Sequence, residues 1–114
     1  MNKEITKSIA FITLGLAASA SGTSATAADL KAGQLAFEAN GCGNCHELSQ
    51  RTVGPSLKEI ARRYKGKQVT AELAERIRIG SEGRWGGPPH PSYEALEATD
   101  ALLITTWIMA GAPK

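Results

Sequence analysis

Both cysteines of this 114-residue chain and one of its two histidines lie in a single pentapeptide, Cys42-Gly43-Asn44-Cys45-His46. Two cysteines at this spacing could form a disulfide, a thioredoxin-like redox pair or half of a zinc site. A thioredoxin-like pair belongs beside a strand, whereas a helix is predicted before Cys42 and no segment has a convincing strand pattern. A four-ligand zinc site would need more cysteines and histidines than the chain contains.

The pattern C-x-x-C-H is typical of covalent haem attachment. The two thiols can add to two vinyl groups on one edge of the ring, and the histidine that follows then lies beneath the iron, which it can coordinate. We therefore predict one haem c, bound through Cys42 and Cys45, with His46 as an iron ligand. A large apolar ring would also enlarge the core of a chain in which only 5% of the residues are aromatic.

Residues 1–27 have the order of a secretory signal peptide, with two lysines, a short apolar run and then small residues. Ala25-Thr26-Ala27 is the preferred cleavage site, and Ala18-Ser19-Ala20 is the second choice. The apolar run is about ten to twelve residues, well short of the ~20 that span a bilayer, which argues against a retained anchor. We predict export to the periplasm, a mature domain over 28–114, and no stable membrane insertion after the leader is removed.

Helical apolar spacing, interrupted by Gly and Pro, predicts four helices in the mature domain, over 30–40, 56–64, 71–79 and 98–110. Asp29 is the expected N-cap of the first helix, Gly41 its stop, and Thr70 the expected cap of the third. The last helix is apolar almost all round, which is typical of a helix buried on most sides. The predicted fold class is therefore all-α.

A loop over 80–92 contains four glycines and three prolines and is the longest predicted connection. Long structured loops in small domains usually wrap something, so this loop is expected to cover the second face of the haem. The net charge of +2 is too small to argue for binding to nucleic acid.

Taken together, these features resemble the small bacterial class I cytochromes c, which are short monohaem electron carriers of the periplasm. The matching residues are Gly33, Phe37, the pentapeptide 42–46, Val53-Gly54-Pro55, Gly80-Ser81, Trp85-Gly86 and Trp107. The resemblance implies the class I cytochrome c fold, four short helices around one covalently bound haem, with Gly33 and Phe37 packed against Trp107. It also implies that the Pro55 carbonyl accepts a hydrogen bond from His46, and that Arg76 and Trp85 hold a haem propionate.

The chain departs from this family at the second axial ligand, which is normally a methionine after the Trp-Gly pair. Aligning Gly80 and Trp85-Gly86 with the family places His90 at that position, and the loop contains no methionine. Met109 falls in the last predicted helix and is expected to be core. We therefore predict His46 and His90 as the iron ligands. The reduction potential should lie below that of His/Met relatives, because imidazole is the stronger donor and stabilises ferric iron.

The predicted function is to carry single electrons between transient redox protein partners, without catalysing a reaction. The alternative is a haem-based sensor or small-ligand-binding cytochrome whose sixth coordination site is open or displaceable. A further alternative is that the protein is a small subunit of a larger redox complex. The basic run 62–67 could orient the protein on an acidic partner, although a solvated face is the simpler interpretation.

Overall fold

The structure is a computed structural model that describes residues 9–15 and 24–114. The predicted leader covers 1–27, and its residues 1–8 and 16–23 lie outside the described residues. The stretch 9–15 has no regular secondary structure, and its large apolar side chains are exposed: Ile9, Phe11, Ile12 and Leu14. Within the described ranges, no helix combines the length and the apolar character needed to cross a membrane.

The described chain forms four α-helices and one short 3₁₀ turn and contains no strand: α1 (Ala27–Ala39), η1 (Cys42–Asn44), α2 (Leu57–Arg63), α3 (Thr70–Ile79) and α4 (Ala98–Met109). The predicted all-α fold is confirmed. The bounds of α2, α3 and α4 agree with the prediction to within one residue, whereas α1 begins three residues earlier than expected.

The first helix starts early because Thr26, and not Asp29, is its N-cap. The Thr26 hydroxyl accepts a hydrogen bond from the backbone N–H of Asp29, and the Asp29 carboxylate accepts one from the backbone N–H of Thr26, both at 3.1 Å. This reciprocal pair is a capping box, which satisfies two backbone donors that a helix start otherwise leaves open. These hydrogen bonds lower the pKa of Asp29. In α3, Thr70 is the first helical residue, and Val69 occupies the cap position without a side-chain bond.

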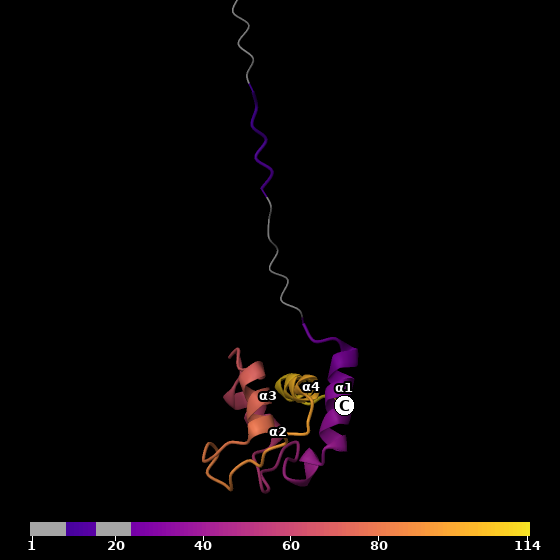
Figure 1. Cartoon of the computed structure of the whole chain (residues 1–114), viewed down its shortest axis with the longest axis vertical. Helices are drawn as coiled ribbons and strands as arrows, with labels where there is room; N and C mark the ends of the chain where they lie inside the picture. Colours follow the sequence, from indigo (N-terminus) through magenta and orange to yellow (C-terminus); the bar gives the residue numbers. More distant parts are fainter. Residues whose placement is uncertain (1–8, 16–23) are drawn as a thin grey trace, which may run out of the picture.

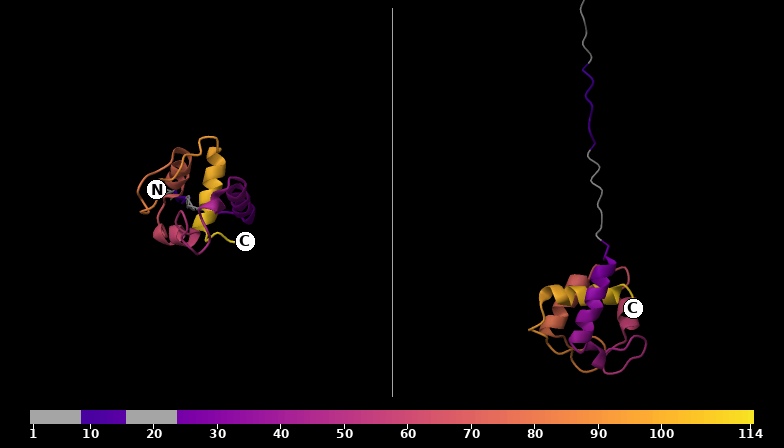
Figure 2. Two further views of the ribbon diagram at one scale, coloured as in Figure 1. Left: turned by 90° about the horizontal axis from the view of Figure 1, so that it is seen from below. Right: turned by 90° about the vertical axis from the view of Figure 1, so that its right-hand side faces the viewer.

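The first and last helices cross at close range, as Figure 2 shows. A Cβ on Gly33 would lie 2.2 Å from the Leu103 carbonyl oxygen and 2.7 Å from the Cβ of Trp107, so the crossing requires glycine. The rings of Phe37 and Trp107 fill it, with centroids 5.1 Å apart at 52°. Such tilted aromatic pairs stabilise by about 1 kcal/mol beyond the area they bury. The predicted contact of Gly33 and Phe37 with Trp107 is confirmed.

The core lies mainly on α4, which is packed between α1 and α3 (Figure 1). Its buried residues are Ala101, Ile104, Thr105, Trp107 and Ile108. Leu102 on the same helix is 44% exposed, so the expectation that α4 is buried on most sides holds only for part of its surface. The loops 41–55 and 80–92 both lie at the lower end of the domain in Figure 1, where 41–55 is next to the lower end of α1 and 80–92 is on the side of α3.

Candidate functional site

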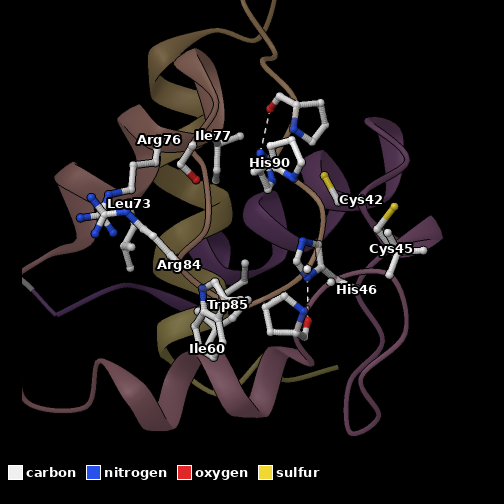
Figure 3. A pocket seen from close by; sticks show the side chains of 18 of the residues that line it. Cys42, Cys45, His46, Ile60, Leu73, Arg76, Ile77, Arg84, Trp85 and His90 are labelled. Carbon is white, nitrogen blue, oxygen red and sulfur yellow. Dashed lines mark hydrogen bonds between the residues drawn. The ribbon is translucent and has the colours of Figure 1, made fainter.

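An open cavity lies between the loops 41–55 and 80–92 and is bounded on its inner side by the helices. Aliphatic side chains from three helices form its inner wall: Ile60, Leu73, Ile77, Ile104 and Ile108. The same cavity is lined by all seven residues singled out from the sequence: Cys42, Cys45, His46, Pro55, Arg76, Trp85 and His90. Figure 3 shows most of them around it.

His46 follows η1 after one intervening residue, Cys45, and is held from below by the turn before α2 (Figure 3). Its Nδ1–H donates to the Pro55 carbonyl at 2.7 Å, which is the hydrogen bond that the resemblance implies. A Cβ on Gly54 would lie 2.7 Å from Cε1 of the same ring, so only glycine lets the turn approach this closely. Burial lowers the pKa of His46 and therefore favours the neutral imidazole, the form that coordinates metals.

The turn that supports His46 is fixed to the start of α2 by a second capping box. The Ser56 hydroxyl accepts from the Glu59 backbone N–H at 3.1 Å, and the Glu59 carboxylate accepts from the Ser56 N–H at 2.7 Å. Because Ser56 is also buried, the helix start has little freedom to shift. Pro55 therefore presents its carbonyl to His46 from a rigid position.

The two cysteines are not bonded to each other in the structure. Cys42 is half-buried and Cys45 is exposed, and both line the cavity. Burial raises the pKa of the free Cys42 thiol above its ordinary value. Figure 3 shows both sulfur atoms on the same side of the cavity, beside His46.

His90 enters the cavity from the opposite loop. Its backbone forms two hydrogen bonds with Ser81, one of 2.7 Å and one of 3.2 Å, which close the loop at its base. Its Nδ1–H donates to the Pro91 carbonyl at 2.8 Å. The ring of Tyr93 lies 5.9 Å from the His90 ring, centroid to centroid.

The two imidazole rings face each other across the cavity (Figure 3). Their centroids are 6.1 Å apart, and their planes are inclined by only 28°. Each ring uses Nδ1 for a backbone carbonyl, so Nε2 of each ring is left available. Met109, by contrast, does not line the cavity.

Arg76 and Trp85 both line the cavity, but their contacts within the described chain differ. The Arg76 guanidinium pairs with Glu72 and lies 3.5 Å from the Tyr64 hydroxyl, to which it donates. The Trp85 indole N–H has no hydrogen-bond partner among the described residues, whereas the Trp85 carbonyl accepts from Arg51 at 2.9 Å.

Two arginines that bind the loop 80–92 beside the cavity were not predicted from the sequence. Arg51 and Arg63 both reach the loop that carries His90 and donate to its backbone carbonyls. Arg63 also lies over the Trp85 ring, 4.2 Å from its centroid. The basic run that includes Arg63 was visible in the sequence, but the backbone carbonyls that these arginines bind carry no residue-type signal.

The donor set fits a metal held in a macrocycle better than a bare metal ion. Among the described residues, no group of three or more His, Cys, Asp or Glu side chains is placed to hold an ion. Two facing imidazoles in an apolar cavity, with two thiols beside them, instead suit a planar ring that brings its own equatorial nitrogens. The fold and the site together define a small all-helical protein with a covalent haem site.

Comparison with known proteins agrees with this class. Residues 30–111 match the family described as Cytochrome c. Cytochrome c-551 of Pseudomonas aeruginosa is 35% identical over 78 residues, 68% of this chain and 74% of the relative. Cytochrome c-552 of Nitrosomonas europaea is 38% identical over 94 residues, 77% of this chain and 91% of the relative. The crystal structure of the wild-type Nitrosomonas europaea cytochrome c552 superposes with a TM-score of 0.62 at 37% identity, covering 66% of this chain and 94% of that one.

The chain therefore belongs to the cytochrome c family, in its class I branch. It binds one haem c covalently through Cys42 and Cys45 of its C-x-x-C-H motif, in which the histidine is His46.

Proposed function

We propose that this protein is a periplasmic carrier of single electrons whose haem iron is held by His46 and His90. The observation that carries the proposal is the position of these two rings, whose centroids are 6.1 Å apart. They face each other across the cavity between the cysteine-bearing loop 41–55 and the proline-rich loop 80–92. An iron with two strong protein ligands is suited to electron transfer and not to chemistry on a substrate.

The spacing of the rings supports coordination from both sides. Metal–imidazole bonds are about 2 Å long and a ring nitrogen lies about 1 Å from its ring centre, so opposed imidazoles on one metal have centroids about 6 Å apart. The observed separation of 6.1 Å matches this value. Both Nδ1 atoms donate to backbone carbonyls, which fixes the tautomer that presents Nε2 to the metal.

The residues around the haem have distinct roles in this proposal. When bound, the haem supplies an iron that takes up and releases one electron. Cys42 and Cys45 tether it, Pro55 makes His46 a better donor through its hydrogen bond, and Arg76 and Trp85 hold a propionate. The aliphatic wall excludes water from the inner side of the cavity. The Pro55 carbonyl holds the His46 ring and the Pro91 carbonyl orients the His90 ring. In this proposal both histidines stay bound in both oxidation states, which keeps the reorganisation small.

Replacement of a thioether ligand by imidazole sets the direction of the reduction potential. Met/His ligation raises the potential of a haem, whereas two imidazoles favour the ferric state. The potential of this protein is therefore expected to lie below that of relatives with His/Met ligation.

The proposed location rests on residues 1–27, interpreted as a cleaved leader, with 28–114 as the mature domain. The expected partners are other redox proteins that bind transiently, since electron transfer complexes are weak and small.

The ligand pair can be tested on purified protein that carries its haem. Electron paramagnetic resonance of the ferric form should show one low-spin species of bis-imidazole type, and the ferrous form should bind carbon monoxide only slowly. His90→Ala should bind carbon monoxide rapidly and completely, which makes it the matched control. A wild-type protein that is high-spin, or that binds carbon monoxide as fast as this variant, would contradict the proposal and favour a sensor.

A second prediction concerns the basic surface next to the site. Lys58, Arg62, Lys65 and Lys67 are exposed and form no ion pair among the described residues, and they lie on and after α2, which also lines the cavity through Ile60. Oxidation by ferricyanide should therefore slow severalfold as ionic strength rises from about 0.01 M to about 1 M, over which the screening length falls from roughly 30 Å to 3 Å.

The triple variant Arg62→Gln, Lys65→Gln and Lys67→Gln should lose most of this salt dependence, because the local attraction of the anion is removed. Rates that do not change with ionic strength in the wild-type protein would show that this surface does not steer charged partners.

A further inference from the structure

The loop that carries His90 is closed at its base but needs separate support at its tip. Its base is held by the two backbone hydrogen bonds between Ser81 and His90. The tip, at Arg84 and Trp85, forms no regular structure and makes no backbone–backbone hydrogen bond among the described residues. Side chains from elsewhere in the fold must therefore fix its position.

Two arginines supply that support, one for each of two consecutive carbonyls. Nη1 of Arg51 donates to the Trp85 carbonyl at 2.9 Å, and Nη1 of Arg63 donates to the Arg84 carbonyl at 2.8 Å. The Arg63 guanidinium also lies over the Trp85 ring at 4.2 Å from its centroid. Hydrogen bonds from a charged donor are stronger than neutral ones, and a cation over an indole ring adds to them.

Both arginines come from segments that also fix His46. Arg51 lies opposite His46 in an isolated antiparallel bridge, and its Nε is 3.7 Å from the Glu59 carboxylate. Glu59 belongs to the capping box that follows Pro55, and Arg63 is the last residue of the same helix. The arginines thus connect the support of one histidine to the loop that carries the other.

We infer that Arg51 and Arg63 are positioning residues that clamp the tip of the distal loop and so keep His90 opposite His46. The inference rests on the proposed ligation by His90. Loss of the clamp should let the loop open more often, and each opening gives His90 a chance to leave the iron and an external ligand a chance to bind.

The test measures how fast cyanide binds to the haem-loaded ferric protein. The cyanide concentration is set high enough that the binding rate no longer depends on it. This limiting rate reports the departure of the internal ligand. Arg51→Gln and Arg63→Gln should each raise it roughly fivefold, and the double variant more than tenfold, as expected for the loss of charged hydrogen bonds at a partly exposed site. Arg63→Lys, which keeps the cation but loses the forked geometry, should fall in between.

Arg62→Gln is the matched control, because it removes the same charge from the adjacent position of α2, where the side chain makes no hydrogen bond or ion pair among the described residues. Its limiting rate should equal that of the wild-type protein. Global unfolding by denaturant is measured on every variant, so that a general loss of stability can be separated from opening of one loop.

The clamp is refuted if the double variant binds cyanide at the rate of Arg62→Gln, or if its faster binding merely follows a lower unfolding midpoint. If the wild-type ferric protein lacks the bis-imidazole signal, the proposed ligation fails and the clamp fails with it. A normal wild-type signal with unchanged rates in the variants would overturn the clamp alone.

Discussion

Replacing His90 with methionine is expected to raise the reduction potential of the haem-loaded protein by on the order of 0.1–0.2 V, a modest part of the roughly 0.8 V over which axial ligands set haem potentials. The thioether is a weaker donor than imidazole, so the substitution removes stabilisation of the ferric state. The loop backbone should tolerate the exchange, since its base is closed by main-chain bonds to Ser81 and its tip by Arg51 and Arg63. Potentiometric titration followed by absorption measures the shift.

Met109→Leu is the control for this experiment, because it removes a methionine that does not line the cavity and leaves the volume of the side chain nearly unchanged. Its potential should equal that of the wild-type protein. A potential in His90→Met that stays at the wild-type value would mean that His90 is not an iron ligand.

Gly33→Ala is expected to destabilise the domain by roughly 3 kcal/mol, at the upper end of the cost of overpacking. The added methyl group would lie 2.2 Å from the Leu103 carbonyl oxygen, which belongs to the backbone of α4 and cannot turn away as a side chain can. The helices must separate, and the Phe37–Trp107 contact opens with them. Denaturant unfolding of the haem-loaded protein measures the loss.

The matched control adds the same methyl group where the structure has room for it. A Cβ on Gly43 would lie 3.7 Å from a ring carbon of Phe37, an ordinary van der Waals distance. Gly43→Ala should change the free energy of unfolding by no more than about 0.5 kcal/mol. Equal stability of Gly33→Ala and the wild-type protein would show that the two helices are not packed as closely as described.

Much of the fold and of the site could be predicted because the informative residues carry distinct chemistry. The pentapeptide 42–46 implies haem by residue type and spacing alone, and Gly, Pro and apolar spacing place three of the four helices to within one residue. The contact of Gly33 with Trp107 and the hydrogen bond from His46 to Pro55 follow from resemblance to the family, and both are present.

The features that were not predicted depend on the backbone or on competition between neighbouring residues. Asp29 and Thr26 are both good caps, and the structure uses Thr26 because the two residues bond reciprocally; the Thr-x-x-Asp spacing of this capping box was present in the sequence and was missed. The acceptors for Arg51 and Arg63 are main-chain carbonyls, which every residue possesses. The exposure of Leu102 likewise depends on which faces of α4 its neighbours cover.

The capping box at the start of α1 has a consequence for how the protein matures. The bond between Ala27 and Ala28, where the proposed cleavage of the leader would fall, lies within the first turn of this helix, and the cap residue Thr26 would then be removed with the leader. A peptidase needs an extended backbone at the bond that it hydrolyses, so α1 would resist cleavage once the helix has formed. Cleavage of the leader in the periplasm should therefore precede the final folding of the domain. In the cleaved chain, Asp29 would then take the N-cap position that Thr26 holds here.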